Sequence, residues 1–189
     1  MYFNFYFTHL VVKHPVCLNF RRFEEEYEDH PGYRLNIYDT IQVWLDRGAP
    51  KEKIIMGTAA YGRGFKLNFP NETGLYCPTS GGIPEGPYTR IEGIWGYQEI
   101  LQARNNDTLI NLPDATPHGW TDVVDDCYKA PYMYNGPYWI GYDNPESITT
   151  KVKYANFLDI AGVMMWSIDK DNFRGDWGQE PYPLLHVTN

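Results

Sequence analysis

Two buried strands, each preceded by an amphipathic helix, constrain the fold of this chain more than any other feature. The first helix is expected to begin after Asn36, which is a good N-cap, and to end near Gly48, where a left-handed residue and the following Pro50 stop it. Residues 53–59 (KIIMGTA) are then typical of a buried strand. A helix, a short loop and a buried strand in this order predict a parallel α/β unit.

A second unit of the same kind closes the sequence. Asn144 is expected to cap a helix in which Pro145 takes the first position, and residues 162–168 (GVMMWSI) predict another buried strand. The interval between the two strands is rich in Gly, Pro, Tyr and Asn, and it is far longer than the usual connection of about four to six residues. We therefore predict an inserted subdomain, with an antiparallel strand at residues 138–142 and a short helix within residues 94–103.

The net charge of −8 argues against partners that carry phosphate groups. An acidic chain without a long basic run repels nucleic-acid backbones and anionic lipid, so neither nucleic acid nor a membrane surface is an expected partner. No segment approaches the roughly 20 apolar residues that span a bilayer. Aromatic residues make up 16% of the chain. Their faces are suited either to binding sugar rings or to filling an aromatic core, and composition does not choose between the two.

The three cysteines are not spaced as a zinc site requires, so no metal and no other cofactor is expected at Cys17, Cys77 or Cys127. Cys77 and Cys127 both lie in the loop-rich middle of the chain, where they form either one disulfide or two buried thiols. Glycosylation sequons begin at Asn71 and Asn106 and favour secretion, although the N-terminus lacks the features of a signal peptide.

A series of motifs in this chain resembles chitinase-type family 18 glycoside hydrolases. The first motifs are similar to the seventh barrel strand of that family and its exit loop, the middle ones to its small α+β chitin insertion domain, and the last ones to the eighth strand, its exit and the final turn. In chain order the matching segments are residues 53–57 (KIIMG), 61–65 (YGRGF), 86–90 (GPYTR), 96–100 (GYQEI), 139–143 (WIGYD), 162–173 (GVMMWSIDKDNF) and 182–185 (YPLL).

The fold implied by this resemblance is α/β: an incomplete (β/α)8 barrel, consisting of the last two strands and helices, with an inserted α+β chitin insertion domain. Residues 34–65 and 144–189 are expected to form the barrel part, and residues 66–143 the insertion domain. Residues 1–33 are expected to be a divergent N-terminal arm, because they are too few to supply the six strands that precede Asn36 in the family.

The activity implied by the resemblance is substrate-assisted, retaining hydrolysis of the β-1,4-linked N-acetylglucosamine polymer chitin by a secreted enzyme. The D-x-x-D-x-D-x-E signature that ends in the catalytic acid is absent, and the nearest text, residues 122–129 (DVVDDCYK), lies inside the insertion. Losing general acid catalysis costs roughly 100-fold to 10,000-fold in rate. Glu92, Glu99 and Asp143 are interpreted as polar loop residues, so we assign no catalytic residue and predict that the chain is inactive alone.

The resemblance also implies a set of substrate-binding residues. Trp166 corresponds to the tryptophan that floors the subsite beside the cleaved bond, the alternative being a core tryptophan on a buried strand. Tyr61 and Arg63 correspond to residues that line the same cleft, although Arg63 is equally suited to anchoring the insertion by a salt bridge. The candidates for the cleft wall within the insertion are Glu92, Trp95, Tyr97 and Trp139.

Three functions remain open at the level of sequence. The first is a part of a secreted, extracellular chitinase that is inert alone. The second is a non-catalytic, lectin-like protein that binds chitin or chito-oligosaccharides through aromatic subsites. The third is a structural fragment with no independent function.

Overall fold

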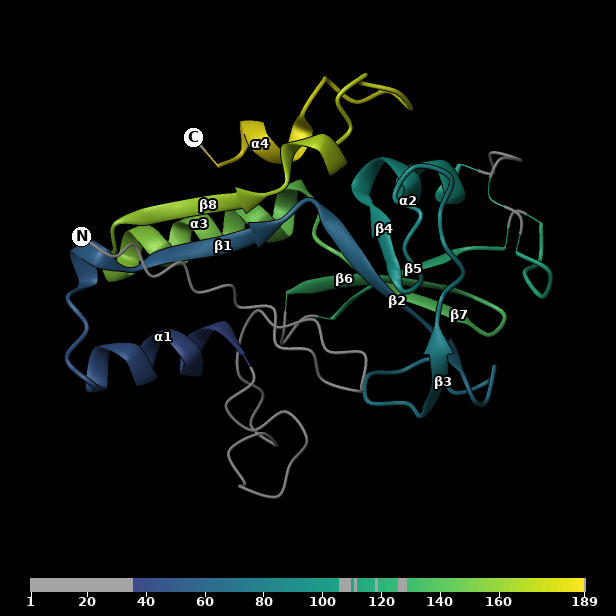
Figure 1. Ribbon diagram of the computed structural model, residues 1–189, viewed down its shortest axis with the longest axis horizontal. Helices are drawn as coiled ribbons and strands as arrows, with labels where there is room; N and C mark the ends of the chain where they lie inside the picture. The colour runs from purple at the N-terminus through teal and green to yellow at the C-terminus, as the bar shows by residue number, and fades with distance from the viewer. Residues whose placement is uncertain (1–35, 106–109, 111, 118, 126–128, 189) are drawn as a thin grey trace.

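The computed structural model describes most of the chain after the predicted N-terminal arm, and residues 1–33 of that arm lie outside the described residues (Figure 1). The described residues are 36–105, 110, 112–117, 119–125 and 129–188. Within them the chain forms two sheets with helices packed against each, which confirms the α/β class.

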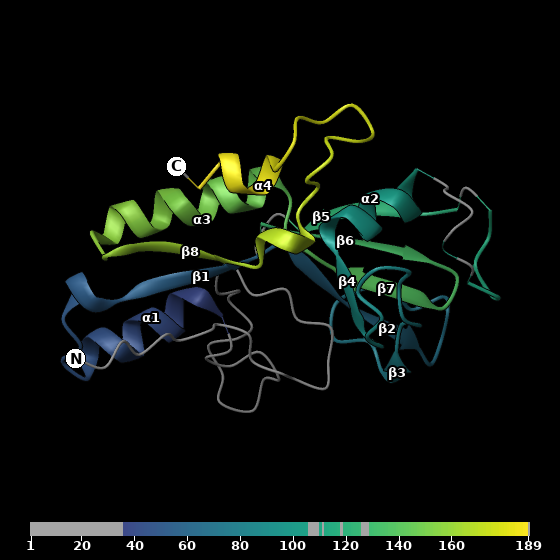
Figure 2. The same cartoon turned by 45° about the horizontal axis from the view of Figure 1, so that its top comes forward.

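The first sheet is a parallel pair made of β1 (Ile55–Ala59) and β8 (Gly162–Trp166). Helices α1 (Ile37–Asp46) and α3 (Pro145–Leu158) flank this pair, as Figures 1 and 2 show. Both predicted α/β units are therefore present, and their strands run side by side although the long interval separates them in sequence. A small apolar core joins the helices to the pair through the buried residues Ile37, Ile41, Met56 and Ala155.

Local side-chain chemistry explains where the two helices begin. The Asn36 side chain accepts a hydrogen bond from the Asp39 N–H at 2.8 Å, and α1 stops before Gly48, whose φ is +81°. The Asn144 side chain accepts from the Ser147 N–H at 2.8 Å, and the Ser147 hydroxyl accepts from the Asn144 N–H at 3.0 Å. Both predicted caps are confirmed.

The second sheet is antiparallel and contains six strands. The helix α2 (Tyr97–Arg104) packs on one of its faces beside the end of the parallel pair (Figure 1). The strand order is β3 (Thr79–Gly82), β2 (Tyr61–Leu67), β7 (Tyr138–Gly141), β6 (Ala130–Asn135) and β5 (Thr121–Asp125), and β4 (Ile94–Gly96) pairs with β2. The antiparallel strand predicted at residues 138–142 is therefore present as β7.

Two boundaries differ from those predicted. The helix expected within residues 94–103 begins only at Tyr97, because Ile94 and Trp95 pair with β2 as a strand and Gly96 takes extended backbone angles at the cap. The strand expected over residues 162–168 ends at Trp166, since a 3-10 turn, η3 (Ile168–Lys170), follows at once. The remaining short elements are η2 (Lys51–Lys53) and α4 (Pro183–His186).

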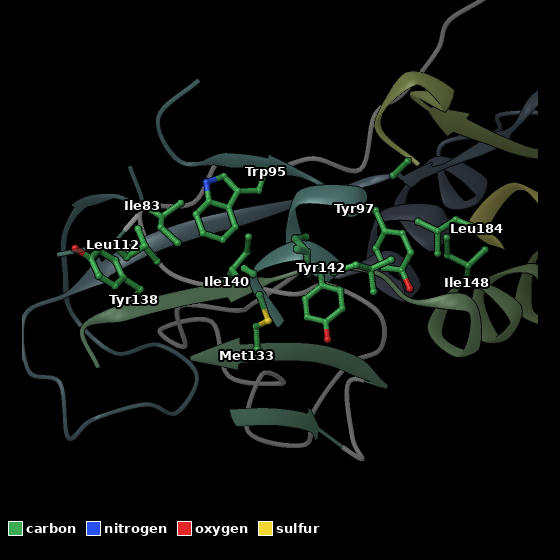
Figure 3. Packing of buried hydrophobic residues seen from close by; sticks show 14 residues of the cluster. Ile83, Trp95, Tyr97, Leu112, Met133, Tyr138, Ile140, Tyr142, Ile148 and Leu184 are labelled. Carbon is green, nitrogen blue, oxygen red and sulfur yellow. The ribbon is translucent and has the colours of Figure 1, made fainter. Parts of the chain in front are cut away.

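The main core lies between the antiparallel sheet and α2 and continues to the C-terminal helices. Figure 3 shows Trp95, Met133 and Ile140 packed at its centre, with Ile148 and Leu184 beside Tyr97 at the far end. All six are buried. This continuous core ties the antiparallel sheet to α3 and α4, so the two sheets form one packed structure.

Glycine residues on β2 allow this core to pack closely. A Cβ atom added at Gly62 would lie 2.8 Å from the Ile100 side chain, and one added at Gly64 would lie 2.3 Å from the Ile83 side chain. No real side chain tolerates these distances, so the face of β2 that meets the core must be bare backbone. In the described part of the chain, no helix has both the length and the apolar character needed to cross a membrane.

Candidate functional site

The candidate site lies at the carboxyl ends of the parallel pair, where Ala59 and Trp166 are the last residues in register. Side chains alternate between the two faces of a strand, and Val163 packs into the core beneath the helices. Trp166, three residues later, therefore points to the face opposite the helices. Its side chain is 52% exposed, which is unusual for a tryptophan that ends a strand of this kind. The structure thus favours the surface interpretation of Trp166 over the core interpretation.

A short ladder of backbone hydrogen bonds fixes Trp166 relative to the antiparallel sheet. The Ala60 N–H donates to the Trp166 carbonyl at 3.0 Å, and the Tyr97 N–H donates to the Ala60 carbonyl at 3.0 Å. The peptide bond between Trp166 and Ser167 is cis. The end of β8, the junction between β1 and β2, and the start of α2 are therefore held together at this point.

Tyr61 and Arg63 lie on one face of β2, two residues apart, and the Arg63 guanidinium interacts electrostatically with the Tyr61 phenol. Both are half-buried. Burial raises the pKa of the Tyr61 phenol, and the Arg63 guanidinium opposes that rise. The phenol therefore keeps its proton at neutral pH and is able to donate a hydrogen bond, while the guanidinium has further N–H groups available for an oxygen-rich ligand.

Glu92 is exposed on the segment before β4 and is held against β3. The Gly82 N–H donates to a Glu92 carboxylate oxygen at 3.2 Å. A Cβ added at Gly82 would lie 2.9 Å from the Glu92 side chain, so this contact depends on the glycine. The Glu92 carboxylate thus has a partner on β3, and its role in the cleft wall stays a prediction.

Three predicted cleft residues are instead part of the core, and the prediction that their rings line an open cleft is wrong. Trp95 and Trp139 are 0% exposed and Tyr97 is 2% exposed. The indole N–H of Trp95 donates to the Pro84 carbonyl at 2.8 Å, and that of Trp139 donates to the Thr73 carbonyl at 3.2 Å. The physical reason is that each face of the antiparallel sheet is covered, one by α2 and the other by the loop that follows β2.

Glu99 is a structural carboxylate at the start of α2. It is fully buried and accepts hydrogen bonds from the N–H groups of Tyr88 at 2.7 Å, Thr89 at 2.8 Å and Gly96 at 2.7 Å, and from the Thr89 hydroxyl. Four donors satisfy both of its oxygens. Glu99 therefore holds the segment that leads to Glu92 and β4, and it is not placed to transfer a proton to a ligand.

Asp143 is also structural. Its carboxylate is buried, 2.5 Å from the Lys151 ammonium and 2.7 Å from the Ser147 hydroxyl. These partners lie on α3, whereas Asp143 follows β7. The ion pair therefore links the end of β7, which is the last strand of the antiparallel sheet along the chain, to α3, the helix that flanks β8.

A polar cluster that was not predicted from the sequence lies directly after Trp166. The Lys170 ammonium donates to the Ser167 hydroxyl at 2.8 Å and lies 3.2 Å from the Asp169 carboxylate. Hydrogen bonding from Ser167, reinforced by Lys170, holds the pKa of Asp169 below its ordinary value of 3.8. The side chain of Asp169 is 69% exposed. Its position three residues after Trp166, the tryptophan that the resemblance assigns to a sugar subsite, is the signal that would have identified it.

The remaining predicted positions are only partly described. Asn71 is exposed, whereas Asn106 lies outside the described residues. Cys77 is half-buried and forms no disulfide with a described residue, and Cys127 lies outside them, so their pairing stays a prediction. Among the described residues, no group of three or more His, Cys, Asp or Glu side chains is arranged to hold a metal ion.

Solved structures of chitinases and chitinase-like proteins share this fold. A Group IV chitinase of Ostrinia furnacalis superimposes with a TM-score of 0.79 at 34% identity, over 91% of this chain and 44% of that chain. Human YKL-39, described as a pseudo-chitinase with retained chitooligosaccharide binding properties, superimposes with a TM-score of 0.75 at 31% identity, over 93% of this chain and 43% of that chain.

Sequence comparison points to the same group of proteins. An endochitinase of Manduca sexta is 34% identical over 161 residues, which cover 82% of this chain and 27% of that protein. The human chitinase-3-like protein 2 is 35% identical over 159 residues, which cover 84% of this chain and 37% of that protein. The chain thus spans less than half the length of these relatives. The sequence profile of the glycosyl hydrolases family 18 matches residues 1–171. The predicted resemblance is confirmed, and the chain belongs to glycosyl hydrolase family 18.

Proposed function

We propose that this chain provides one side of a carbohydrate-binding cleft in an extracellular chitinase-type protein, and that its ligand is chitin or a chito-oligosaccharide. The observation that carries the proposal is the half-exposed indole of Trp166 at the carboxyl ends of two parallel strands. The apolar face of a pyranose ring packs well on such a surface, because its C–H groups meet the electron-rich face of the indole.

Polar groups on β2, on the segment before β4 and directly after Trp166 complement the rest of a sugar. Tyr61 and Arg63 supply hydrogen-bond donors for hydroxyl and acetamido oxygens, and the exposed carboxylates of Glu92 and Asp169 supply acceptors for sugar hydroxyl groups. An aromatic platform with a few fixed polar groups is the usual composition of a sugar-binding or other small-ligand site. N-acetylglucosamine fits this set, because it combines one apolar ring face with an amide and several hydroxyl groups.

We also propose an assignment of the two sheets to the parts of the family fold. The parallel pair with α1 and α3 corresponds to the last two strands and helices of a (β/α)8 barrel. The antiparallel sheet with α2 corresponds to the chitin insertion domain. Among the described residues, β1 and β8 pair only with each other, and the helices cover only one face of the pair. Parallel sheets are normally covered on both faces. In barrels of this kind the substrate lies at the carboxyl ends of the strands, which is where Trp166 is found.

We further propose that the chain binds its ligand without hydrolysing it. The acidic signature of the family is absent from the sequence. Glu99 and Asp143 are buried among their own hydrogen-bond partners, and the lowered pKa of Asp169 keeps that residue ionised at neutral pH, when a general acid must be protonated. A family member that retains sugar binding as a pseudo-chitinase, human YKL-39, shows that the two properties separate in this family.

A titration with chito-oligosaccharides, followed by calorimetry and tryptophan fluorescence, tests this function. Full burial of a large side chain is worth about 1.5–3 kcal/mol, so covering the exposed half of Trp166 contributes about 0.8–1.5 kcal/mol, or about four- to tenfold in affinity. We expect Trp166→Ala to weaken binding by about four- to tenfold. The control is Phe157→Ala, which removes an aromatic ring that is 82% exposed on α3, a helix that covers the opposite face of the parallel pair.

Each result of this titration decides between the candidate functions. Equal binding by Trp166→Ala and the unsubstituted chain would exclude the proposed site, and no binding by either would favour a structural fragment. Turnover of a fluorogenic chito-oligosaccharide by the unsubstituted chain would contradict the proposed lack of hydrolysis.

A further inference from the structure

The turn that follows β2 presents a glycosylation sequon at an exposed corner. The Glu72 N–H donates to the Phe69 carbonyl at 2.9 Å, which closes a β-turn with Pro70 and Asn71 at its two central positions. Proline favours the first of these positions, and asparagine is well suited to the second. Asn71 is exposed, and with Glu72 and Thr73 it completes the triplet Asn-x-Thr without proline in the middle.

An exposed aromatic ring accompanies this sequon. Phe69 is 56% exposed and belongs to none of the three hydrophobic clusters that the described residues form. It precedes Asn71 by two residues across the turn, so its ring is on the same short loop as the acceptor amide. A phenylalanine with this exposure gains little from the fold itself, and a ligand with an apolar face would cover it.

The base of the turn is firmly attached to the antiparallel sheet. The Thr73 carbonyl accepts the indole N–H of the buried Trp139, and Leu75 and Cys77 pack against the same cluster. The loop therefore holds its tip in a defined position. An acceptor at a fixed, exposed corner is accessible to the transferase, and the apolar ring beside it offers a surface on which an attached sugar can rest.

We propose that Asn71 carries an N-linked glycan whose first N-acetylglucosamine packs on the ring of Phe69. In the transfer, the Asn71 amide nitrogen forms a bond to C1 of the first sugar of a lipid-linked oligosaccharide. The bond from C1 to the lipid diphosphate breaks, the diphosphate leaves with the electron pair, and the amide proton passes to a base of the transferase. The first sugar then covers the exposed Phe69 ring with its apolar face. This inference rests on the extracellular location proposed above and is independent of ligand binding at Trp166.

Occupancy is tested with the full chain secreted from eukaryotic cells and digested for mass spectrometry. We expect the peptide that contains residues 69–73 to carry a glycan in the unsubstituted chain and in Thr73→Ser, and to be unmodified in Asn71→Gln and Thr73→Ala. A secreted, unmodified chain would overturn the inference while leaving the sugar-binding proposal intact.

The role of Phe69 is tested by limited proteolysis of residues 68–78 in four forms: the unsubstituted chain, Phe69→Ala, Asn71→Gln and the double variant. Phe69→Ala should speed cleavage several-fold in the glycosylated chain and leave it nearly unchanged in the Asn71→Gln background, because the exposed ring then has no sugar to contact. An equal effect of Phe69→Ala in both backgrounds would show that the ring does not meet the glycan.

Discussion

Replacing Lys151 with methionine removes the cation from the buried ion pair between α3 and the residue that follows β7. The side chains of Lys151 and Asp143 are only 10% and 6% exposed, so the remaining carboxylate would stay in a poorly hydrated site with the Ser147 hydroxyl as its partner. Removing one member of such a pair costs about 3–5 kcal/mol. Since a whole domain is stable by only about 5–15 kcal/mol, this is a large part of the total.

Thermal unfolding followed by circular dichroism measures this loss. A change of 1 kcal/mol shifts the melting temperature by about 2–4 °C in a chain of this size, so we expect Lys151→Met to melt roughly 6–20 °C lower. Lys153→Met is the matched control, because it makes the same substitution at an exposed position of the same helix. We expect that variant to change stability by no more than about 0.5 kcal/mol.

A double variant separates the ion pair from the shape of the lysine side chain. Asp143→Leu combined with Lys151→Met removes both charges, and it should recover part of the stability lost in the single variant, because no uncompensated charge then remains buried. The reasoning is refuted if Lys151→Met melts within experimental error of Lys153→Met, or if the double variant is no more stable than Lys151→Met.

Two further predictions concern β2 and the polar cluster after Trp166. Gly64→Ala should destabilise the chain by more than about 1 kcal/mol in urea unfolding, because the added carbon would lie 2.3 Å from the Ile83 side chain. Gly74→Ala is the control, because a carbon added there would have no other atom within 4 Å. Similar urea midpoints for the two variants would contradict the described packing of Gly64 against Ile83. The pKa of Asp169 is lower in the folded chain, so its contribution to stability is present above the ordinary value of 3.8 and is lost as the pH falls through the folded value. The urea midpoint of the unsubstituted chain should therefore fall below about pH 4, and this fall should be smaller in Asp169→Asn, with the larger difference between the two at low salt. The same pH dependence of the midpoint in both chains would exclude the contact with Ser167.

The elements that depend on neighbouring residues were predictable from the sequence. The caps at Asn36 and Asn144, the left-handed Gly48 and the strands β1 and β8 each follow from interactions within a few residues. The predicted burial holds for β1 but not for β8, which contains no buried residue. The pairing of β1 with β8 was implied by the resemblance to a known family, since strands so far apart in sequence give no local sign of their contact.

The burial of individual aromatic side chains was not predictable. Trp139 is enclosed because register places it beside Phe65 on β2 and Tyr134 on β6, and because the loop after β2 folds over it. Each of these contacts joins distant segments, so the local pattern around Trp139 is the same for a buried ring and an exposed one. Trp166 shows the converse, because an apolar strand pattern predicts burial, but the strand ends at that residue and its ring lies on the face opposite the helices.

The pairing of β2 with β7 has a consequence for how this protein tolerates change. The chain leaves the parallel pair through β2 and returns to α3 through β7, and these two strands are direct neighbours, with Arg63 opposite Gly141. The chain between them therefore enters and leaves through one hairpin-like stem, while α2 and β4 add packing against α3 and α4. Insertions at the edge strands β3 and β5 are expected to alter the rim of the antiparallel sheet without displacing β1 from β8, so that rim can diversify while the carboxyl ends of the parallel strands keep their geometry.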